Sequence, residues 1–215
     1  MTHPIPSRTE DPAYRILKEK ILSFHYRQGF QLKEEVLGKE FNLTRNQVRK
    51  AITFLAAEGL VIKYPNRGAF VTTLSKAEVD EIFEVREALE VKAAALAIRR
   101  ASREELDRIS HSIEKRERLM DGDKLRSFFI PGMDFHYEIV KLSKNEILKS
   151  TWQGLHTKLQ LIRIQSAMAD DRFLKAVKEH KEILSCIYQN RPDEMEHLLL
   201  LHIRRAKSIY SVSPE

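Results

Sequence analysis

Residues 37–71 constrain the fold of this chain more than any other part of its sequence. They read as a short helix, a turn, a second helix and a tight β-hairpin, an order that predicts a winged helix-turn-helix. Thr44 and Gln47 match a capping box, in which each side chain meets the backbone N–H of the other residue, so they fix where the second helix begins. Apolar residues at helical spacing predict its buried face, namely Val48, Ala51, Ile52 and Leu55.

The opposite face of this helix and the tip of the hairpin are the predicted DNA-contacting surfaces. Arg matches the edge of guanine, Asn can pair with adenine, and Lys or Arg can meet phosphates. Residues 60–62 and 69–73 read as two strands, and the turn between them puts Arg67 at the tip. A lone basic residue is more often a solvated surface charge, but the joint pattern favours DNA binding. The candidate DNA-binding residues are Thr44, Arg45, Asn46, Gln47, Arg49, Lys50, Arg67 and Gly68.

Residues 13–75 resemble the DNA-binding domain of GntR-family bacterial regulators. The recurrent pattern of that family, SR-x-PVREAL-xx-L-xx-EGLV-xxx-P-x-RG-x-FV, stands here as TRNQVRKAITFLAAEGLVIKYPNRGAFV. Gln47 replaces the usual Pro at the helix start, and Gln28-Gly29 replaces the usual Pro-Gly earlier in the domain. Neither change removes a DNA-facing charge, so the resemblance implies a DNA-binding domain.

Composition supports two domains with different partners. The chain has 215 residues and a hydrophobic content of 42%, enough for two cores. Residues 1–75 carry 12 Lys and Arg against 7 Asp and Glu, whereas residues 76–215 carry 25 against 24. A basic excess confined to one domain is expected when only that domain meets phosphates. With no apolar run near ~18 residues, no signal peptide and the single cysteine Cys186, we expect a cytoplasmic protein without a membrane partner.

After residue 75 the sequence predicts only helices. Capping boxes at Ser75-Lys76-Ala77-Glu78 and Ser102-Arg103-Glu104-Glu105 begin the first two. Further helices are predicted at 123–130, 132–142, 145–168, 171–189 and 193–210. The expected fold is therefore mainly α, with a winged helix-turn-helix followed by an all-α antiparallel helical bundle. The expected divisions are a flexible arm (1–11), the DNA-binding domain (12–75) and an effector-binding and dimerisation domain (76–215).

Three histidines in the predicted bundle point toward its interior, one from each of three helices: His136, His180 and His202. A single inward histidine is more often a hydrogen-bonded core residue than a ligand. Three neutral imidazoles that converge would suit zinc or a similar divalent ion. Spacing alone does not show that they converge.

Residues 76–215 resemble the FCD ligand-binding domain of the FadR-like branch of the same family. The matching pieces are Arg86-Glu87-Ala88-Leu89-Glu90, Asp134-Phe135-His136 with Asn145, His180 and His202. In many members three His and an Asp four residues before the first His hold a metal, which binds a small carboxylate effector. Here Gly132 stands at that Asp position, and Asp134 lies about 200° from His136 around a regular helix, unless Pro131-Gly132 breaks it. A zinc, nickel or manganese site and a metal-free pocket both stay open.

An anionic effector also needs cationic and polar partners from the protein. The candidates are Arg86 and Arg163, with Asn145 and Gln160 beside them. For Arg86, a buried pair with Glu90 one turn further along the helix explains the residue at least as well.

These features predict a regulator and not an enzyme. It would bind a double-stranded, pseudo-palindromic operator as a homodimer, usually as a repressor, and a small organic acid would alter its affinity. One alternative is a three-histidine metalloenzyme, although the sequence has no HExxH and no general base placed by motif. The other is an architectural DNA-binding dimer without an effector.

Overall fold

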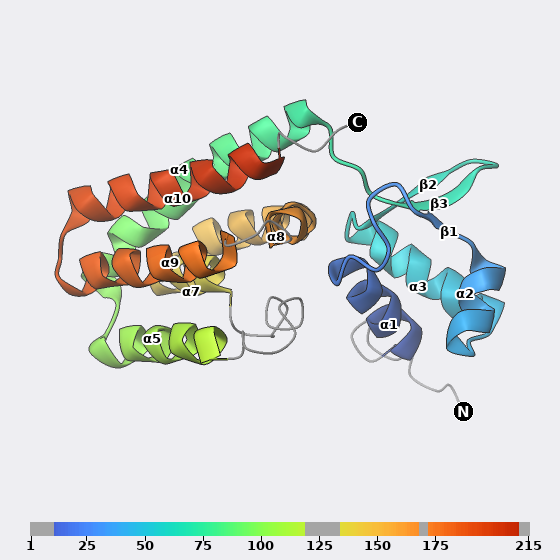
Figure 1. Ribbon diagram of the computed structural model, residues 1–215, viewed down its shortest axis with the longest axis horizontal. Coiled ribbons are helices and arrows are strands. Elements are labelled where there is room, and N and C mark those ends of the chain that lie inside the picture. Colours follow the sequence, from blue (N-terminus) through green and yellow to red (C-terminus); the bar gives the residue numbers. More distant parts are fainter. Residues whose placement is uncertain (1–10, 119–133, 168–171, 211–215) are drawn as a thin grey trace. The chain divides into compact units, whose positions relative to one another are not determined.

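The computed structural model describes residues 11–118, 134–167 and 172–210. The chain divides into two compact units, Met1–Leu74 and Ser75–Glu215, and Figure 1 shows the elements of each. This division lies one residue before the boundary expected from the sequence. The expected arm falls almost wholly outside the described residues.

The first unit is a winged helix-turn-helix, as predicted. Its elements are α1 (Pro12–Leu22), β1 (Gln31–Leu32), α2 (Glu34–Phe41), α3 (Arg45–Ala57), β2 (Val61–Tyr64) and β3 (Gly68–Val71). Asn42 ends α2 in the left-handed conformation, with φ at 53°. The turn then passes so close to Gly38 that a Cβ there would lie 2.8 Å from the carbonyl oxygen of Leu43. The tight turn between α2 and α3 therefore depends on a residue without a side chain.

The predicted capping box fixes the start of α3. Thr44 Oγ1 accepts a hydrogen bond from the Gln47 N–H at 3.3 Å, and Gln47 Oε1 accepts one from the Thr44 N–H at 2.8 Å. The predicted inner face is confirmed, since all four residues are buried: Val48, Ala51, Ile52 and Leu55.

The wing is a three-stranded antiparallel sheet in the order β1-β3-β2. In the hairpin, Val61 pairs with Val71 and Tyr64 with Gly68. The hairpin was predicted, although β2 runs to Tyr64 and so extends beyond the predicted strand. The third strand, β1, was not predicted, because its two residues are too few to show an alternating pattern.

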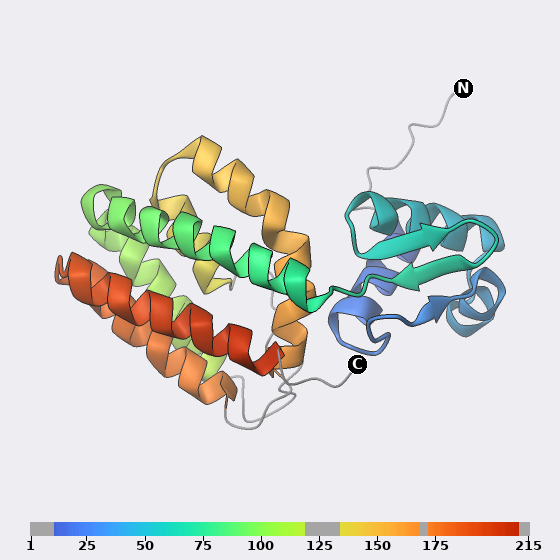
Figure 2. The same cartoon turned by 90° about the horizontal axis from the view of Figure 1, so that it is seen from above.

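The second unit is all helical over its described residues. It contains α4 (Lys76–Arg100), α5 (Arg103–Arg118), α7 (Phe135–Leu142), α8 (Glu146–Ala167), α9 (Arg172–Tyr188) and α10 (Pro192–Tyr210). Figures 1 and 2 show α4 and α10 side by side, with α9 alongside α10. The helix α7 packs against α4. No described helix is long and apolar enough to cross a membrane.

Helix starts in this unit follow local capping chemistry. The capping box of Ser75 and Glu78 is present, and Ser102 and Glu105 exchange the expected hydrogen bonds. The prediction that a helix begins at residue 132 is wrong, because Asp134 is extended (φ −82°, ψ 98°) and caps α7, which begins at Phe135. The predicted helix at 123–130 lies outside the described residues.

Candidate functional site

The outer face of α3 carries the side chains predicted to contact DNA. The side chains of Arg45 and Arg49 are 73% and 53% exposed, and Asn46 is exposed beside them. Thr44 and Gln47 are also exposed, but Thr44 Oγ1 and Gln47 Oε1 are engaged in the cap. The arginines and Asn46 are therefore the residues of this helix best placed to reach a partner.

Glu34, in the first turn of α2, contacts both arginines of α3. Its carboxylate accepts two hydrogen bonds from Arg49, from Nε to Oε1 at 3.0 Å and from Nη2 to Oε2 at 2.9 Å. It accepts a third from Arg45 Nε to Oε2 at 3.0 Å. The hydrogen bond from Arg49 is the main cause of a lowered pKa for Glu34. Sequence reasoning missed this residue, because nothing in the local pattern relates it to α3.

The remaining predicted DNA contacts lie at the edge of α3 and in the wing. Lys50 Nζ is 3.2 Å from Asp11 Oδ2, so Lys50 is partly committed to the start of α1. Arg67 is exposed at the hairpin tip, where its guanidinium lies 5.6 Å from the centre of the Tyr64 ring. Gly68 takes a φ of 96°, which allows the sharp turn that displays Arg67.

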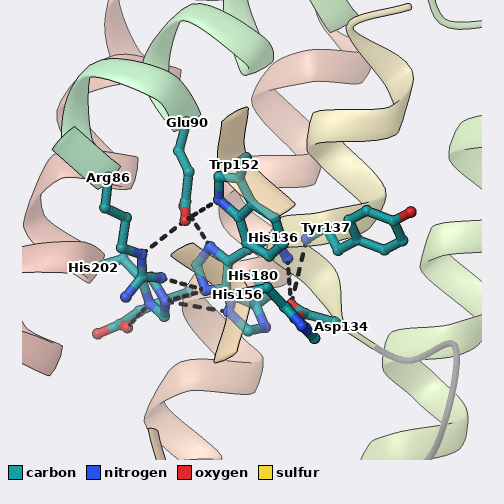
Figure 3. A network of polar contacts seen from close by, with 10 residues as sticks. Arg86, Glu90, Asp134, His136, Tyr137, Trp152, His156, His180 and His202 are labelled. Carbon is teal, nitrogen blue, oxygen red and sulfur yellow. Dashed lines mark hydrogen bonds and ion pairs between the residues drawn. The ribbon is translucent and has the colours of Figure 1, made fainter. Parts of the chain in front are cut away.

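The three predicted histidines converge in the interior of the second unit (Figure 3). His136 comes from α7, His180 from α9 and His202 from α10, and all three are buried. His202 Nε2 lies 3.1 Å from His136 Nε2 and 3.3 Å from His180 Nε2. One ligand atom from each histidine lies within 4.8 Å of the others, a spacing that suits a shared metal ion. Convergence, which the sequence left open, is confirmed.

Two carboxylates set the direction in which these rings point. Glu90 Oε2 is 2.6 Å from His136 Nδ1, and Glu179 Oε2 is 2.5 Å from His202 Nδ1. A carboxylate accepts, so each Nδ1 donates and each neutral ring turns the lone pair of its Nε2 toward the other. Two lone pairs 3.1 Å apart repel each other unless a proton or a cation lies between them. The donor set therefore fits a divalent metal, with carboxylates behind the histidines as in known metal sites.

Glu90 joins the histidine centre to a buried network on α4 and α8. Its Oε1 accepts from Arg86 Nε at 2.7 Å and from Trp152 Nε1 at 3.1 Å. Burial opposes the charge of Glu90, but the positive charge of Arg86 and the hydrogen bonds from His136 and Arg86 outweigh it and hold the pKa of Glu90 below its ordinary value. The sequence suggested either a buried pair of Arg86 with Glu90 or a role for Arg86 in effector binding, and the structure contains the pair. Arg86 Nη2 also lies 3.0 Å from His136 Nε2, at the centre itself.

Asp134 does not belong to the histidine centre, so we correct the ligand set to three histidines. Its Oδ1 accepts from the backbone N–H groups of His136 and Tyr137, at 3.1 and 3.4 Å, and so caps α7. Its Oδ2 faces His156, at 3.5 Å from Nε2 (Figure 3). The metal-compatible group found among the described residues contains the three histidines and no carboxylate.

The other predicted effector residues are not gathered at the histidine centre by any described contact. Asn145 accepts from the Leu148 N–H at 3.1 Å and caps α8. Gln160 is half-buried on α8, and the side chain of Arg163 lies outside the described part of the chain.

A small cavity lies against His180 on the side of α5. Its polar lining comes from Ser112, Arg116, Glu138 and His180. Ser112 and Arg116 were not predicted. No motif of their helix relates them to His180, and only the fold brings them there. The cavity measures about 10 Å³, room for one water molecule, and it places a hydroxyl and a guanidinium on the same space as His180.

Comparison with known proteins agrees with both units. The model of the bacterial regulatory proteins of the gntR family matches residues 9–71, and that of the FCD domain matches residues 81–205. The HTH-type transcriptional regulator YdhC of Bacillus subtilis is 27% identical over 190 residues, covering 88% of this chain and 85% of that protein. The HTH-type transcriptional repressor RspR of Escherichia coli is 23% identical over 203 residues, covering 94% and 89%.

Solved structures share the fold. E. coli McbR/YncC superposes with a TM-score of 0.75 at 18% identity, covering 96% of this chain and 98% of that one. The family models, the relatives and the fold all agree with the sequence-based resemblance. The chain belongs to the GntR family of bacterial regulatory proteins, and it is a DNA-binding transcription regulator with an FCD domain.

Proposed function

We propose that this regulator binds its operator as a homodimer and that a small carboxylate-bearing metabolite, bound at the histidine centre, changes its operator affinity. The convergence of three buried Nε2 atoms, two of them aimed by carboxylates, is the observation that supports a ligand site. A core with no ligand would not need three polar rings at its centre, because buried polar groups are costly unless they are satisfied. As a bacterial DNA-binding protein it would act in the cytoplasm.

The DNA-reading part of the proposal rests on the exposed face of α3. Arg45, Asn46 and Arg49 would meet base edges in the major groove, while Arg67 in the wing would meet phosphate. One such helix covers only a half-site, so two copies related by a two-fold axis are needed for a pseudo-palindromic operator. The repressor named among the relatives makes repression the expected outcome.

The preferred form of the ligand site contains a divalent metal. His136, His180 and His202 would hold zinc, nickel or manganese, and the metal would supply a Lewis acid with open positions for a carboxylate. Glu90 and Glu179 would keep the three rings in the ligating tautomer and orientation. Ser112 and Arg116 would contact the rest of the effector once its binding widens the adjoining cavity, which measures about 10 Å³ in this structure.

A metal-free form is the second candidate, and the position of Arg86 favours it. Its Nη2 lies 3.0 Å from His136 Nε2, so the guanidinium competes for the lone pair that a metal would need. In this form Arg86 would bind the effector carboxylate directly.

Metal analysis and thermal melting distinguish the two forms. Protein purified without chelator or a metal-binding tag is measured for metal content and melted with and without zinc, nickel and manganese. With a metal site, His180→Ala lowers metal content and thermal stability together, because a metal bound only by the folded state stabilises it. His111→Ala, an exposed histidine on α5, is the control and should change neither. The metal form is wrong if wild-type protein takes up none of the three ions and shows no thermal shift.

A further inference from the structure

The negative charge of Glu34 lies within the surface that should approach DNA phosphates. Three hydrogen bonds join it to Arg45 and Arg49, and its own side chain is only 26% exposed. A carboxylate so close to DNA weakens the general attraction for phosphate. A glutamate beside the two groove-facing arginines is therefore expected to have a role that offsets this loss of attraction.

The hydrogen-bond pattern leaves selected atoms of each arginine available to DNA. Arg49 uses Nε and Nη2 on Glu34, so its Nη1 and the second proton of Nη2 remain for DNA. In its contacts with the described residues Arg45 uses Nε alone, which leaves both Nη groups for DNA. A paired fork of N–H donors is the geometry that reads the O6 and N7 edge of guanine. Anchoring through Nε fixes the side of the guanidinium on which that fork lies.

We propose that Glu34 is a positioning residue for sequence reading, which holds Arg45 and Arg49 in their base-reading orientation and limits their binding to phosphate. The inference rests on the DNA-reading role proposed for α3. Ordering one long side chain on binding costs about two- to tenfold in affinity. Prior anchoring by Glu34 removes part of that cost for the correct sequence, while its charge penalises binding that relies on phosphate alone.

Glu35 provides a matched control one residue away. Both glutamates lie in the first turn of α2, so they have the same charge and interact similarly with the dipole of that helix. Glu35 pairs with Lys39 on its own helix at 2.9 Å. Within the described residues Glu35 makes no hydrogen bond or ion pair with a side chain of α3, and only a weaker attraction between its charge and that of Arg45 links it to that helix. Removing either glutamate deletes one negative charge, but only removal of Glu34 releases the arginines.

The experiment compares two duplexes across six proteins. One duplex is the sequence that wild-type protein enriches from a random library, and the other is a mixed-sequence duplex of equal length. Binding of wild-type protein, Glu34→Ala, Glu35→Ala and the double variant Arg45→Ala/Arg49→Ala is measured over a salt series, with melting temperatures as a folding check. Glu34→Gln, which keeps the shape of the side chain, is the second test variant.

We expect Glu34→Ala to lower the ratio of selected to mixed affinity by roughly five- to twentyfold. Its salt dependence on the mixed duplex should steepen by about one unit relative to Glu35→Ala, because a released arginine adds a phosphate contact. Glu34→Gln should lower the ratio in the same direction. Adding Glu34→Ala to the double arginine variant should have no further effect on the ratio, since the two act together.

The inference is overturned if Glu34→Ala and Glu35→Ala give the same ratio, or if Glu34→Ala still lowers it after both arginines are removed. A failure of the DNA-reading role proposed for α3 would give a different result. In that case the double arginine variant would bind the selected duplex as tightly as wild-type protein does.

Discussion

Removal of the Glu90 carboxylate should strongly destabilise the helical unit. Arg86 is only 1% exposed. In Glu90→Leu, which keeps a side chain of similar size, the Arg86 guanidinium loses the carboxylate that it contacts at 2.7 Å. Breaking a buried ion pair from one side costs roughly 3–5 kcal/mol. For a domain of this size each kcal/mol lowers the melting temperature by about 2–4 °C, so we expect a fall of about 6–20 °C.

Thermal melting followed by circular dichroism measures this effect, and a second variant tests its cause. Replacing both members of the pair, as Glu90→Leu with Arg86→Met, should recover part of the loss, because the double variant no longer buries an unpaired guanidinium. Recovery should be incomplete, because His136 Nδ1 and Trp152 Nε1 still lack the Glu90 acceptor. A fall of less than about 2 °C in the single variant would refute the argument. So would a double variant that is no more stable than the single one.

Four further substitutions test the histidine centre, two helical glycines and the wing. Glu90→Gln can present an amide N–H to His136 Nδ1, which would move the ring proton to Nε2, the atom that should bind the metal. Metal affinity, measured by competition with a chelator, should therefore fall about 10–100-fold. Unchanged affinity would argue against the role of Glu90. Gly154→Ala, on an exposed face of α8 with nothing within 4 Å of the new Cβ, should stabilise by up to about 1 kcal/mol in denaturant titrations. Gly38→Ala should destabilise the protein in the same assay, because its Cβ would lie 2.8 Å from the Leu43 carbonyl oxygen. Equal effects of the two Gly→Ala changes on the free energy of unfolding would contradict this assignment of a steric role to Gly38. Arg67→Ala should weaken operator binding and flatten its salt dependence by about one unit, and an unchanged slope would remove Arg67 from phosphate.

The DNA-binding unit could be predicted closely because its signals are local. The capping box of Thr44 and Gln47 and the helical spacing of Val48 to Leu55 lie within one helix, and the structure reproduces both. β1 could not be predicted, because its two residues gain their strand geometry only by pairing with β3. The contact of Glu34 with α3 is missing from the local pattern for the same reason, since the turn between the helices creates it.

The histidine centre was predicted only in outline. Helical spacing identified three inward histidines, but their convergence depends on how α7, α9 and α10 pack. The carboxylate of Glu179 directly precedes His180 in sequence, yet it orients His202 from a neighbouring helix. The sequence left the role of Asp134 open, because it could not show whether Pro131-Gly132 breaks the helix; in the structure Asp134 caps α7.

Operator binding in the presence of small carboxylic acids tests the central claim most directly, namely that the histidine centre controls DNA affinity. Wild-type protein and His202→Ala are titrated against the selected operator with saturating zinc and a panel of two- to six-carbon mono- and dicarboxylates. The account predicts that at least one acid changes operator affinity by about 5–150-fold in wild-type protein and has no such effect in His202→Ala. The claim would be contradicted by an acid that raises the melting temperature of wild-type protein but not of His202→Ala, and yet leaves the operator affinity of wild-type protein unchanged.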